Sequence, residues 1–488
     1  MQFTTYDKLI VEPYELERIL DLSIDAKINK HTRAILIGRI TPEKEDEYAK
    51  TTGIGTNIKI SQMVDDEEKI LFQGVVVRIE VRTVGGVYHL CVEALSYTYL
   101  LDIKKIKRSW QNKEQTYDQL LAEVCAAYDR AYFINLAAAE VPTGQLILQI
   151  DETDMELAVR LSSWHNTGIV PDHTKDSPQF YFGIPKDLEQ VEIEGQEYAV
   201  TKDIGQIRTA AVNYIPGLNE QIVNYHVIGD QVLKIGQPVS FLGKTLYVLS
   251  FFSIMTEGLL KHHYILTQAD GLKQNRFYNQ RLTGLSLMGR VIDVTRDQVK
   301  VHLDIDQTQD VATAYWFPYS TMYTGSGTGW YCPPELNDII RVYSPTAQES
   351  GCFAISAASV ERPEDAAGQS EEADGGEGGS ADEYGLDRDR LGDTSVKSLM
   401  TIYGKEIVFA PKSITIHGGS FHIVLHDDNG IDIYTENDIN MHAKKKITIA
   451  SEKIAVIGKE RISLTCEKGS QIVMDANIEL TGAEVKSN

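Results

Sequence analysis

The chain has few cysteines, and none of them is placed to pair with another. Its 488 residues contain five, which are Cys91, Cys125, Cys332, Cys352 and Cys466, and no two form a C-x-x-C pair. A disulfide framework needs closely spaced cysteines, and a structural zinc site needs paired ligands. We therefore expect reduced, buried thiols and neither a metal site nor another cofactor.

Long apolar runs are also absent. No window reaches the roughly 18 apolar residues that a membrane-spanning helix needs. Residues 1–18 lack the basic start and the apolar stretch of a signal peptide. The sequence therefore predicts a protein that is made in the cytoplasm without a signal peptide.

Positive charge is scarce as well. The 47 Lys and Arg residues face 70 Asp and Glu residues, which gives a formal net charge of -23. Proteins that bind nucleic acid need clustered Lys and Arg for the phosphates, so we expect no nucleic-acid partner. The 42% of hydrophobic residues is ordinary for globular protein, and the length suggests about three or four domains.

Residues 361–390 divide the chain into two different regions. They contain eleven acidic and three basic residues, four glycines between 375 and 379, and almost no large apolar side chain. Such a segment cannot bury enough apolar surface to offset the entropy lost on ordering. We interpret it as an acidic, Gly-rich flexible linker.

The region that follows the linker, 391–488, contains an eight-residue repeat. One apolar series starts at Leu425 and steps by eight, slips by one residue before Val456, and continues by eight to Leu480. A second series lies two residues before each member of the first, and only Ser470 interrupts it. The fifteen apolar positions are Ile423, Leu425, Ile431, Ile433, Ile439, Met441, Ile447, Ile449, Ile454, Val456, Ile462, Leu464, Ile472, Ile478 and Leu480.

Each repeat unit predicts one short strand with a single buried face. The residues between the paired apolar positions are mostly polar or small, which is the period-two pattern of a strand. One stripe per unit must find apolar partners, and three copies around a shared axis would supply them. We therefore predict an intertwined triple-stranded β-helix with the fifteen positions as its trimer core. A single-chain β-solenoid or a plain antiparallel sheet remains the alternative.

Residues 286–360 predict a small all-β module. The segments GRVIDV, QVKVHLDID, IIRVYS and CFAISA read as short strands between turn signals, which favours a barrel of the OB type. The Gly-rich loop GSGTGW lacks the Lys and Ser or Thr of a phosphate-binding loop. Nucleotide binding is therefore not expected.

The first 285 residues predict mostly strands. Candidates include Lys69 to Val84, Tyr88 to Ala94, Gln145 to Ile150 and Leu246 to Phe252. Two helices are also expected. One covers Tyr117 to Tyr128 after the cap Thr116, and the other covers Asp154 to Trp164, where Thr153 and Glu156 form a capping box.

No catalytic or metal-binding constellation stands out. The residue types of a hydrolase triad occur close together in Asp172, His173, Ser162 and Ser163. The G-x-S-x-G motif that presents such a nucleophile is absent, so a triad is not expected. Asp151 with Glu156 is one of many carboxylate pairs, and helix capping explains Glu156. The repeat-region histidines, which are His417, His422, His426 and His442, are expected on the surface.

Three segments in fixed order resemble the VgrG proteins of type VI secretion and the hub and spike of contractile phage tails. Ser96 to Val124 and Glu152 to Asp172 resemble strand-to-helix segments of the hub. Gly289 to Asp306 with Thr328 to Tyr343 resembles the OB domain, and the octads resemble the triple-stranded β-helix. The resemblance covers nearly the whole chain apart from the linker.

The resemblance implies a mainly β protein with a few helices and four parts. Residues 1–285 would form the hub from two barrel-like modules with inserted helices, 286–360 an OB-fold module, 361–390 the linker and 391–488 the trimeric spike. It further implies a homotrimer that acts mechanically and is not an enzyme. Its partners would be the inner tube and baseplate proteins, a tip protein or effector, and transiently the target cell envelope. The chain would be assembled into the particle and driven out on contraction.

Two departures from the family pattern matter. T-even phages carry a lysozyme domain between the OB module and the β-helix, where this chain has only the linker. Some spike tips bind iron through H-x-H, but residues 481–488 contain no histidine. A separate tip protein or a blunt tip is therefore expected. The rival functions are a hub-associated cell-wall hydrolase and a trimeric receptor-binding fibre.

Overall fold

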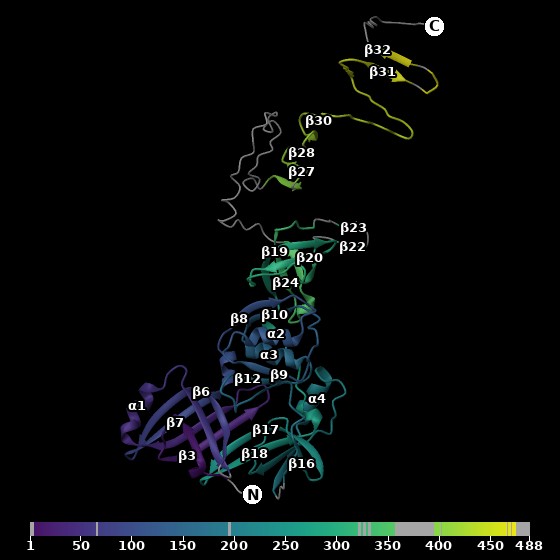
Figure 1. Ribbon diagram of the computed structural model, residues 1–488. Coiled ribbons are helices and arrows are strands. Elements are labelled where there is room, and N and C mark those ends of the chain that lie inside the picture. Colours follow the sequence, from purple (N-terminus) through teal and green to yellow (C-terminus); the bar gives the residue numbers. More distant parts are fainter. Residues whose placement is uncertain are drawn as a thin grey trace, which may run out of the picture. The chain divides into compact units, whose positions relative to one another are not determined.

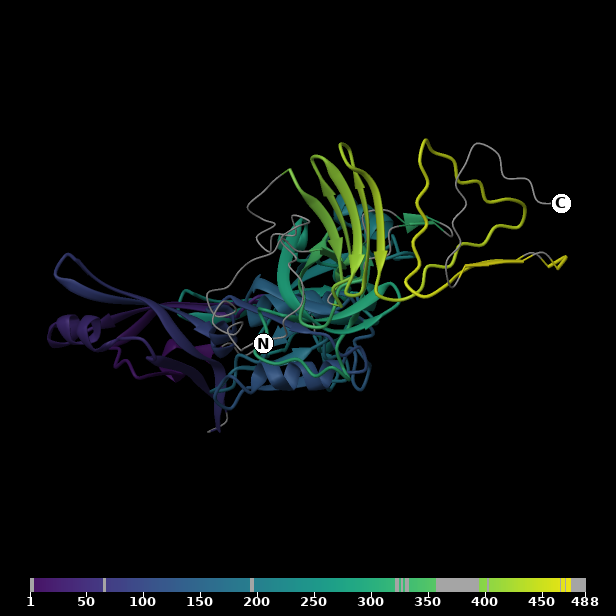
Figure 2. The same cartoon turned by 90° about the horizontal axis from the view of Figure 1, so that it is seen from above.

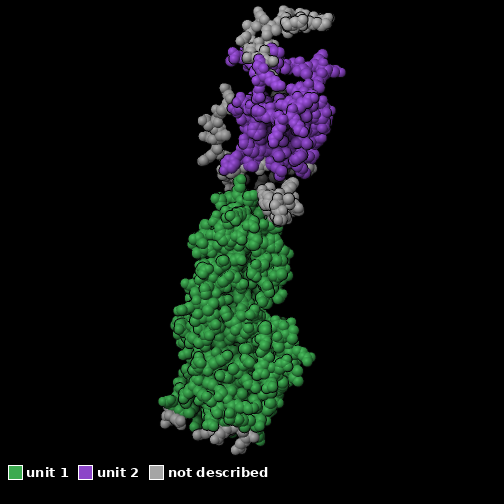
Figure 3. Space-filling view, turned by 90° about the vertical axis from the view of Figure 1, so that its right-hand side faces the viewer, with its two compact units in different colours: residues 1–369 green, residues 370–488 purple. Residues whose placement is uncertain are grey.

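A computed structural model describes residues 4–64, 67–193, 197–320, 324–325, 328–329, 333–356, 395–401, 403–465, 467–469 and 471–474. The chain divides into two compact units, Met1–Gln369 and Ser370–Asn488 (Figure 3). The predicted linker, 361–390, lies outside the described residues. The expected fold class is confirmed, because strands dominate both units and only four α-helices are present in the described residues.

Thirteen strands of the first unit form one large sheet (Figures 1 and 2). Its hydrogen-bonded path runs through β14 (Tyr198–Thr201), β15 (Asn224–Gly229), β18 (Leu259–Thr267), β17 (Lys244–Thr256), β3 (Arg18–Lys27), β4 (Arg33–Ile40), β7 (Val87–Ser96), β6 (Glu67–Val84), β5 (Asn57–Val64) and β2 (Leu9–Glu12). Off this path lie β1 (Thr4–Thr5), β13 (Val191–Glu192) and β16 (Pro238–Phe241). Alternate side chains along the strands face the core, as with Leu22, Ile24 and Ala26 in β3.

A smaller α/β region is inserted in the sequence between β7 and β13 of the large sheet. It contains β8 (Ile106–Trp110) paired with β10 (Ile147–Glu152), and β9 (Tyr132–Asn135), β11 (Ile169–Pro171) and β12 (Gln179–Phe182) in a three-stranded sheet. The two predicted helices are confirmed as α2 (Tyr117–Cys125) and α3 (Asp154–Ser163). Both begin with a complete capping box, at Thr116 with Gln119 and at Thr153 with Glu156.

The remaining helices of the described residues are short. They are α1 (Glu45–Thr51), α4 (Ile204–Asn213) and the 3-10 helices η1 (Tyr6–Lys8), η2 (Pro42–Lys44), η3 (Tyr97–Asp102), η4 (Ala269–Leu272), η5 (Gln280–Leu282) and η6 (Glu349–Gly351). The sequence did not predict α4, which buries only Ala210 and packs on a small cluster of its own with Ile215, Leu218 and Ile222.

Five strands close into a barrel in the order β19, β20, β21, β25, β24. They are β19 (Leu285–Thr295), β20 (Gln298–Leu303), β21 (Trp316–Ser320), β24 (Ile339–Ser344) and β25 (Phe353–Ser356), and β22 (Thr324–Gly325) pairs with β23 (Thr328–Gly329) beside them. The closed five-stranded barrel matches the expected module. The sequence missed β21, because Pro318 interrupts its strand pattern.

The second unit contains a five-stranded antiparallel meander and a separate hairpin. The meander runs through β26 (Lys397–Met400), β27 (Glu406–Ala410), β28 (Ser413–Gly418), β29 (Phe421–His426) and β30 (Gly430–Thr435). The hairpin joins β31 (Ile462–Thr465) to β32 (Gln471–Met474). Residues 436–461 between them contain no strand or helix.

Candidate functional site

One face of the meander is apolar across its strands β27–β30. Residues directly opposite each other in a sheet share a face, and Ile407, Ile416, Ile423 and Ile433 are opposite one another in successive strands. A second row on this face contains Phe409, Ile414, Leu425 and Ile431. Ile431 is 69% exposed and Ile433 is 56% exposed, so nothing among the described residues covers this side of β30.

Residues 436–461 expose their apolar side chains even more fully. Ile439, Met441, Ile447, Ile449, Ile454 and Val456 are between 52% and 69% exposed. In the hairpin, Leu464 is 57% and Ile472 is 56% exposed. A soluble protein rarely leaves so many large apolar side chains uncovered unless they meet a partner. Among the described residues of the single chain, the octad region is therefore an apolar surface without a cover.

Eleven of the fifteen predicted core residues are exposed in the described structure. Besides the eight just given, they are Leu425, Ile431 and Ile433. Ile423 and Ile462 are partly buried, and Ile478 and Leu480 lie outside the described residues. The assignment of these residues to a trimer core stays a prediction.

The predicted regular series of short strands is only partly formed. The single chain has no strand at 439–441, 447–449 or 454–456, although the octad pattern predicts one at each. A strand needs a neighbour for its backbone hydrogen bonds, and these residues have no paired neighbour within the described chain. For β26–β30, the alternative of a plain antiparallel sheet describes what this chain forms.

The other face of the meander holds a row of ionisable and aromatic side chains. Glu406, His417, His422 and Tyr434 are opposite one another in four successive strands. Nε2 of His417 lies 2.9 Å from Oε2 of Glu406, whose side chain is fully buried, and the His422 ring stacks on Tyr434 at 5.0 Å. The expectation of surface histidines is met only in part: His442 is exposed, His426 is partly buried, and the side chains of His417 and His422 are 22% and 18% exposed.

These histidines do not assemble a metal centre. The described residues contain no group of three or more His, Cys, Asp or Glu side chains that could hold a metal ion. The same part of the chain contains no helix that is long and apolar enough to span a membrane. The row is best explained as cross-strand packing in the meander.

The barrel is fastened to the β8–β10 pair by polar contacts. The backbone N–H and the hydroxyl of Ser109 donate to the two carboxylate oxygens of Asp306, over 2.7 and 2.6 Å. The Gln111 amide donates to the Val301 carbonyl and accepts from the Tyr315 N–H. Leu146, Leu148 and Ile150 also belong to the same apolar cluster as the barrel core. Barrel and β8–β10 pair therefore share one core, which stiffens their junction.

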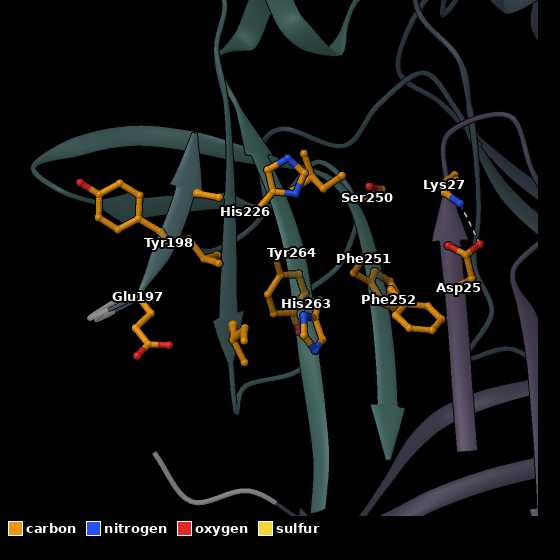
Figure 4. Close-up of a pocket in the computed structure, with 14 residues that line it drawn as sticks. Asp25, Lys27, Glu197, Tyr198, His226, Ser250, Phe251, Phe252, His263 and Tyr264 are labelled. Atoms are coloured by element: carbon orange, nitrogen blue, oxygen red, sulfur yellow. Dashed lines mark hydrogen bonds and ion pairs between the residues drawn. The ribbon is translucent and has the colours of Figure 1, made fainter. Parts of the chain in front are cut away.

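A hollow of the first unit lies on the sheet of β14, β15, β18, β17 and β3, and has a volume of about 690 Å³ (Figure 4). Its wall includes His226, His263, Phe252 and Tyr198, and at its far end Lys27 pairs with Asp25 over 2.8 Å. Burial lowers the pKa of His263, and the positive charge of Lys261 lowers it further. The hollow is an open sheet face, and its residues show no nucleophile held by a base.

The serine, aspartate and histidine residues of the candidate hydrolase triad have other partners. The Ser162 hydroxyl donates to the Val159 carbonyl, and the Ser163 hydroxyl donates to the Arg160 carbonyl. Asp172 accepts from the hydroxyl and the N–H of Thr174. Burial lowers the pKa of His173 to about 4. Each group therefore serves local structure.

Comparison with known proteins gives structural relatives only. No family model matches the chain, and no curated protein matches it. A type VI secretion component of E. coli, described as similar to the T4 bacteriophage tail proteins gp27 and gp5, matches with a TM-score of 0.51 and 13% identity over 71% of this chain and 99% of that chain. The lidded PdpA–VgrG complex of Francisella matches with a TM-score of 0.53 and 8% identity over 86% of this chain and 76% of that chain. The half-lidded form of the same complex matches with a TM-score of 0.51 and 10% identity over 88% of this chain and 88% of that chain.

This chain has the VgrG-like tail-hub fold. The two matches to PdpA–VgrG complexes cover more than four fifths of it, so the likeness is not limited to one domain. At such low identity the comparison shows the fold alone. The motif order in the sequence pointed to the same fold, although no single motif was specific enough to do so.

Proposed function

We propose that three copies of this VgrG-like chain form the baseplate hub and membrane-puncturing spike of a contractile injection machine. The observation that carries the proposal is the uncovered apolar surface of the octad region, together with a fold shared with VgrG and tail hub proteins. Three copies would provide the missing cover. The machine would be a type VI secretion system, an R-type bacteriocin, an extracellular injection particle or a phage tail.

The two parts of the octad region support trimer formation in different ways. The meander β26–β30 pairs its backbone within one chain and leaves one apolar face, so three such sheets can form the walls of a prism. Within the described part of the chain, no strand pairs with residues 436–461, so their hydrogen bonds would come from the other two copies. An intertwined segment resists peeling under axial load, which suits a spike.

The proposed action is mechanical. The chain would contact inner tube and baseplate proteins at its hub, and a tip protein or effector at the far end of its octads. Contraction would then drive the spike through the target envelope. The rival hydrolase predicts that purified protein clears cell-wall substrate, and a lysozyme control shows that the assay works. A receptor-binding fibre would instead retain affinity for intact cells without a sheath.

The deciding experiment is the native mass of the full chain, measured by light scattering. A trimer of about 164 kDa, three chains of 54.6 kDa, is the expected result. A monomer at micromolar concentration would overturn the proposal, because the octads would then close within one chain. The same mass measurement at high salt serves as the control, because an association through an apolar core persists in salt and an association through charges does not.

A further inference from the structure

Three charged side chains are buried together where the barrel meets α3. Arg160 of α3 is 2% exposed, Glu152 at the end of β10 is 4% exposed and Glu349 in η6 is 2% exposed. Nε and Nη2 of Arg160 each donate to a carboxylate oxygen of Glu152 over 2.8 Å, and Nη1 donates to Oε1 of Glu349 over 2.7 Å. One cation therefore serves two buried carboxylates.

The charges of this triad do not balance when both glutamates are ionised. Glu152 holds the guanidinium through two parallel hydrogen bonds, the strongest arrangement for such a pair. The Leu148 carbonyl also accepts from Nη2, over 3.0 Å. A second carboxylate would leave one unit of negative charge without compensation in the protein interior, where isolated charge is costly. A proton on Glu349 removes that charge and still allows Oε1 to accept from Arg160.

We propose that Glu349 is a proton-binding site of the junction between hub and barrel, neutral in mildly acidic solution and ionised, with a weakened junction, as the pH rises. The inference goes beyond the proposed function, because it concerns one chain and holds in any oligomeric state. Glu349 lies between the barrel strands β24 and β25, while Arg160 and Glu152 belong to the other side of the junction. The proton would therefore act on the contact through which the barrel is attached.

The surrounding groups favour this assignment. Burial raises the pKa of Glu349, and the negative charge of Glu152 raises it further, while Arg160 opposes both without cancelling them. The other ionisable or charged neighbours are Tyr117 of α2, Cys352 after η6, and Arg276 and Tyr278 in the wall of an adjoining cavity of about 310 Å³. Arg276 is exposed, so water screens its charge from Glu349.

The direction of the effect follows from this raised pKa. The folded chain binds the proton of Glu349 more tightly than the unfolded chain does, so acid stabilises the folded state. This contribution to stability is complete below the ordinary glutamate pKa. It is lost as the pH rises through the pKa that Glu349 has in the folded chain. Buried histidines elsewhere in the chain act in the opposite direction. A single pH profile is therefore not decisive, and a comparison of variants is required.

The test measures Tm of the full chain and of Glu349→Gln between about pH 5 and pH 8. The amide mimics the neutral acid, so we expect the two Tm values to be closest at the acid end and to separate as the pH rises, with the variant higher by roughly 2–4 °C at the alkaline end. Glu114→Gln, which changes an exposed loop glutamate, serves as the matched control and should shift Tm equally at both ends. A Tm difference between Glu349→Gln and the parent that is the same at every pH would overturn the proposal.

A second variant keeps the test decisive if Glu349→Gln does not fold. Glu152→Gln leaves Arg160 with one carboxylate, so Glu349 should then stay ionised throughout this pH range. The Trp164 ring lies 5.4 Å from the Arg160 guanidinium and lines the same cavity as Glu349, so its fluorescence reports on the triad. Subtracting the signal of Trp164→Phe isolates it. We expect a titration in the parent that Glu152→Gln lacks, and its persistence in Glu152→Gln would contradict the proposal.

Discussion

Leu464 of β31 lies directly opposite Ile472 of β32, and each side chain is more than half exposed in the single chain. Such a pair stabilises a hairpin only if something covers it, because burial of one large apolar side chain contributes about 1.5–3 kcal/mol. In a trimer, six such side chains would meet around the axis. The pair is therefore a sensitive place to test the spike.

Leu464→Asp should abolish the trimer or lower its Tm strongly. The change would place three carboxylates close together in an apolar core, where unpaired charge is costly. Light scattering and thermal unfolding measure the effect. Ser463→Asp is the matched control, since Ser463 is exposed, precedes Leu464 and points to the other face of the hairpin. Unchanged melting of Leu464→Asp would remove Leu464 from the core.

Thr153→Ala should destabilise the first unit by about 1–2 kcal/mol. The Thr153 hydroxyl accepts from the Glu156 N–H over 3.1 Å and donates to Asp102 over 2.5 Å, so the variant loses the helix cap and a contact to η3. Urea unfolding gives the free-energy change. Thr209→Ala, at an exposed position inside α4, is the control and should be neutral or slightly stabilising. An equal effect of both changes would show that the cap contributes nothing.

Local signals predicted much of this fold. The capping box at Thr153 and Glu156 fixed the start of α3, because both halves of the box lie within four residues of each other. Alternation of apolar residues likewise predicted β6, β7 and β17 to within a few residues at each end. The order of the barrel segments predicted the module, although β21 was missed because Pro318 conceals it. Short-range chemistry carried each of these predictions.

Contacts between distant segments could not be predicted in this way. Glu349 pairs with Arg160 across 189 residues of sequence. The sequence around either residue alone looks like that of an ordinary charged residue on the surface. The row of Glu406, His417 and His422 depends on the register of three strands, which the octad count does not supply. For residues 436–461 the octad pattern predicts short strands that the described single chain does not form, so this part of the prediction stays untested.

Ser109→Ala should loosen the junction of barrel and β8–β10 pair. The Ser109 hydroxyl is one of two donors to the partly buried Asp306 carboxylate, whose pKa burial raises, and its loss should cost about 1–3 kcal/mol. Tm and amide hydrogen exchange in β20 measure the effect. Ser286→Ala, at an exposed position of β19, is the control. No loss of protection in β20 would mean that the shared apolar cluster alone holds the junction.

The first unit should lose stability as the pH falls from about 6.5 to 4, because of two buried histidines. Burial lowers the pKa of both His173 and His262 to about 4, so the unfolded chain takes up protons in this range while the folded chain does not. The neutral rings therefore contribute their full stability above the histidine pKa of the unfolded chain. This contribution is lost as the pH falls toward the lower pKa that the histidines have in the folded chain. His173→Gln should flatten part of the Tm profile in this range, whatever its effect on Tm at neutral pH. His226→Gln, at an exposed position of β15, should leave the slope unchanged. An equal slope in the parent and His173→Gln would show that His173 does not stay neutral in the folded first unit.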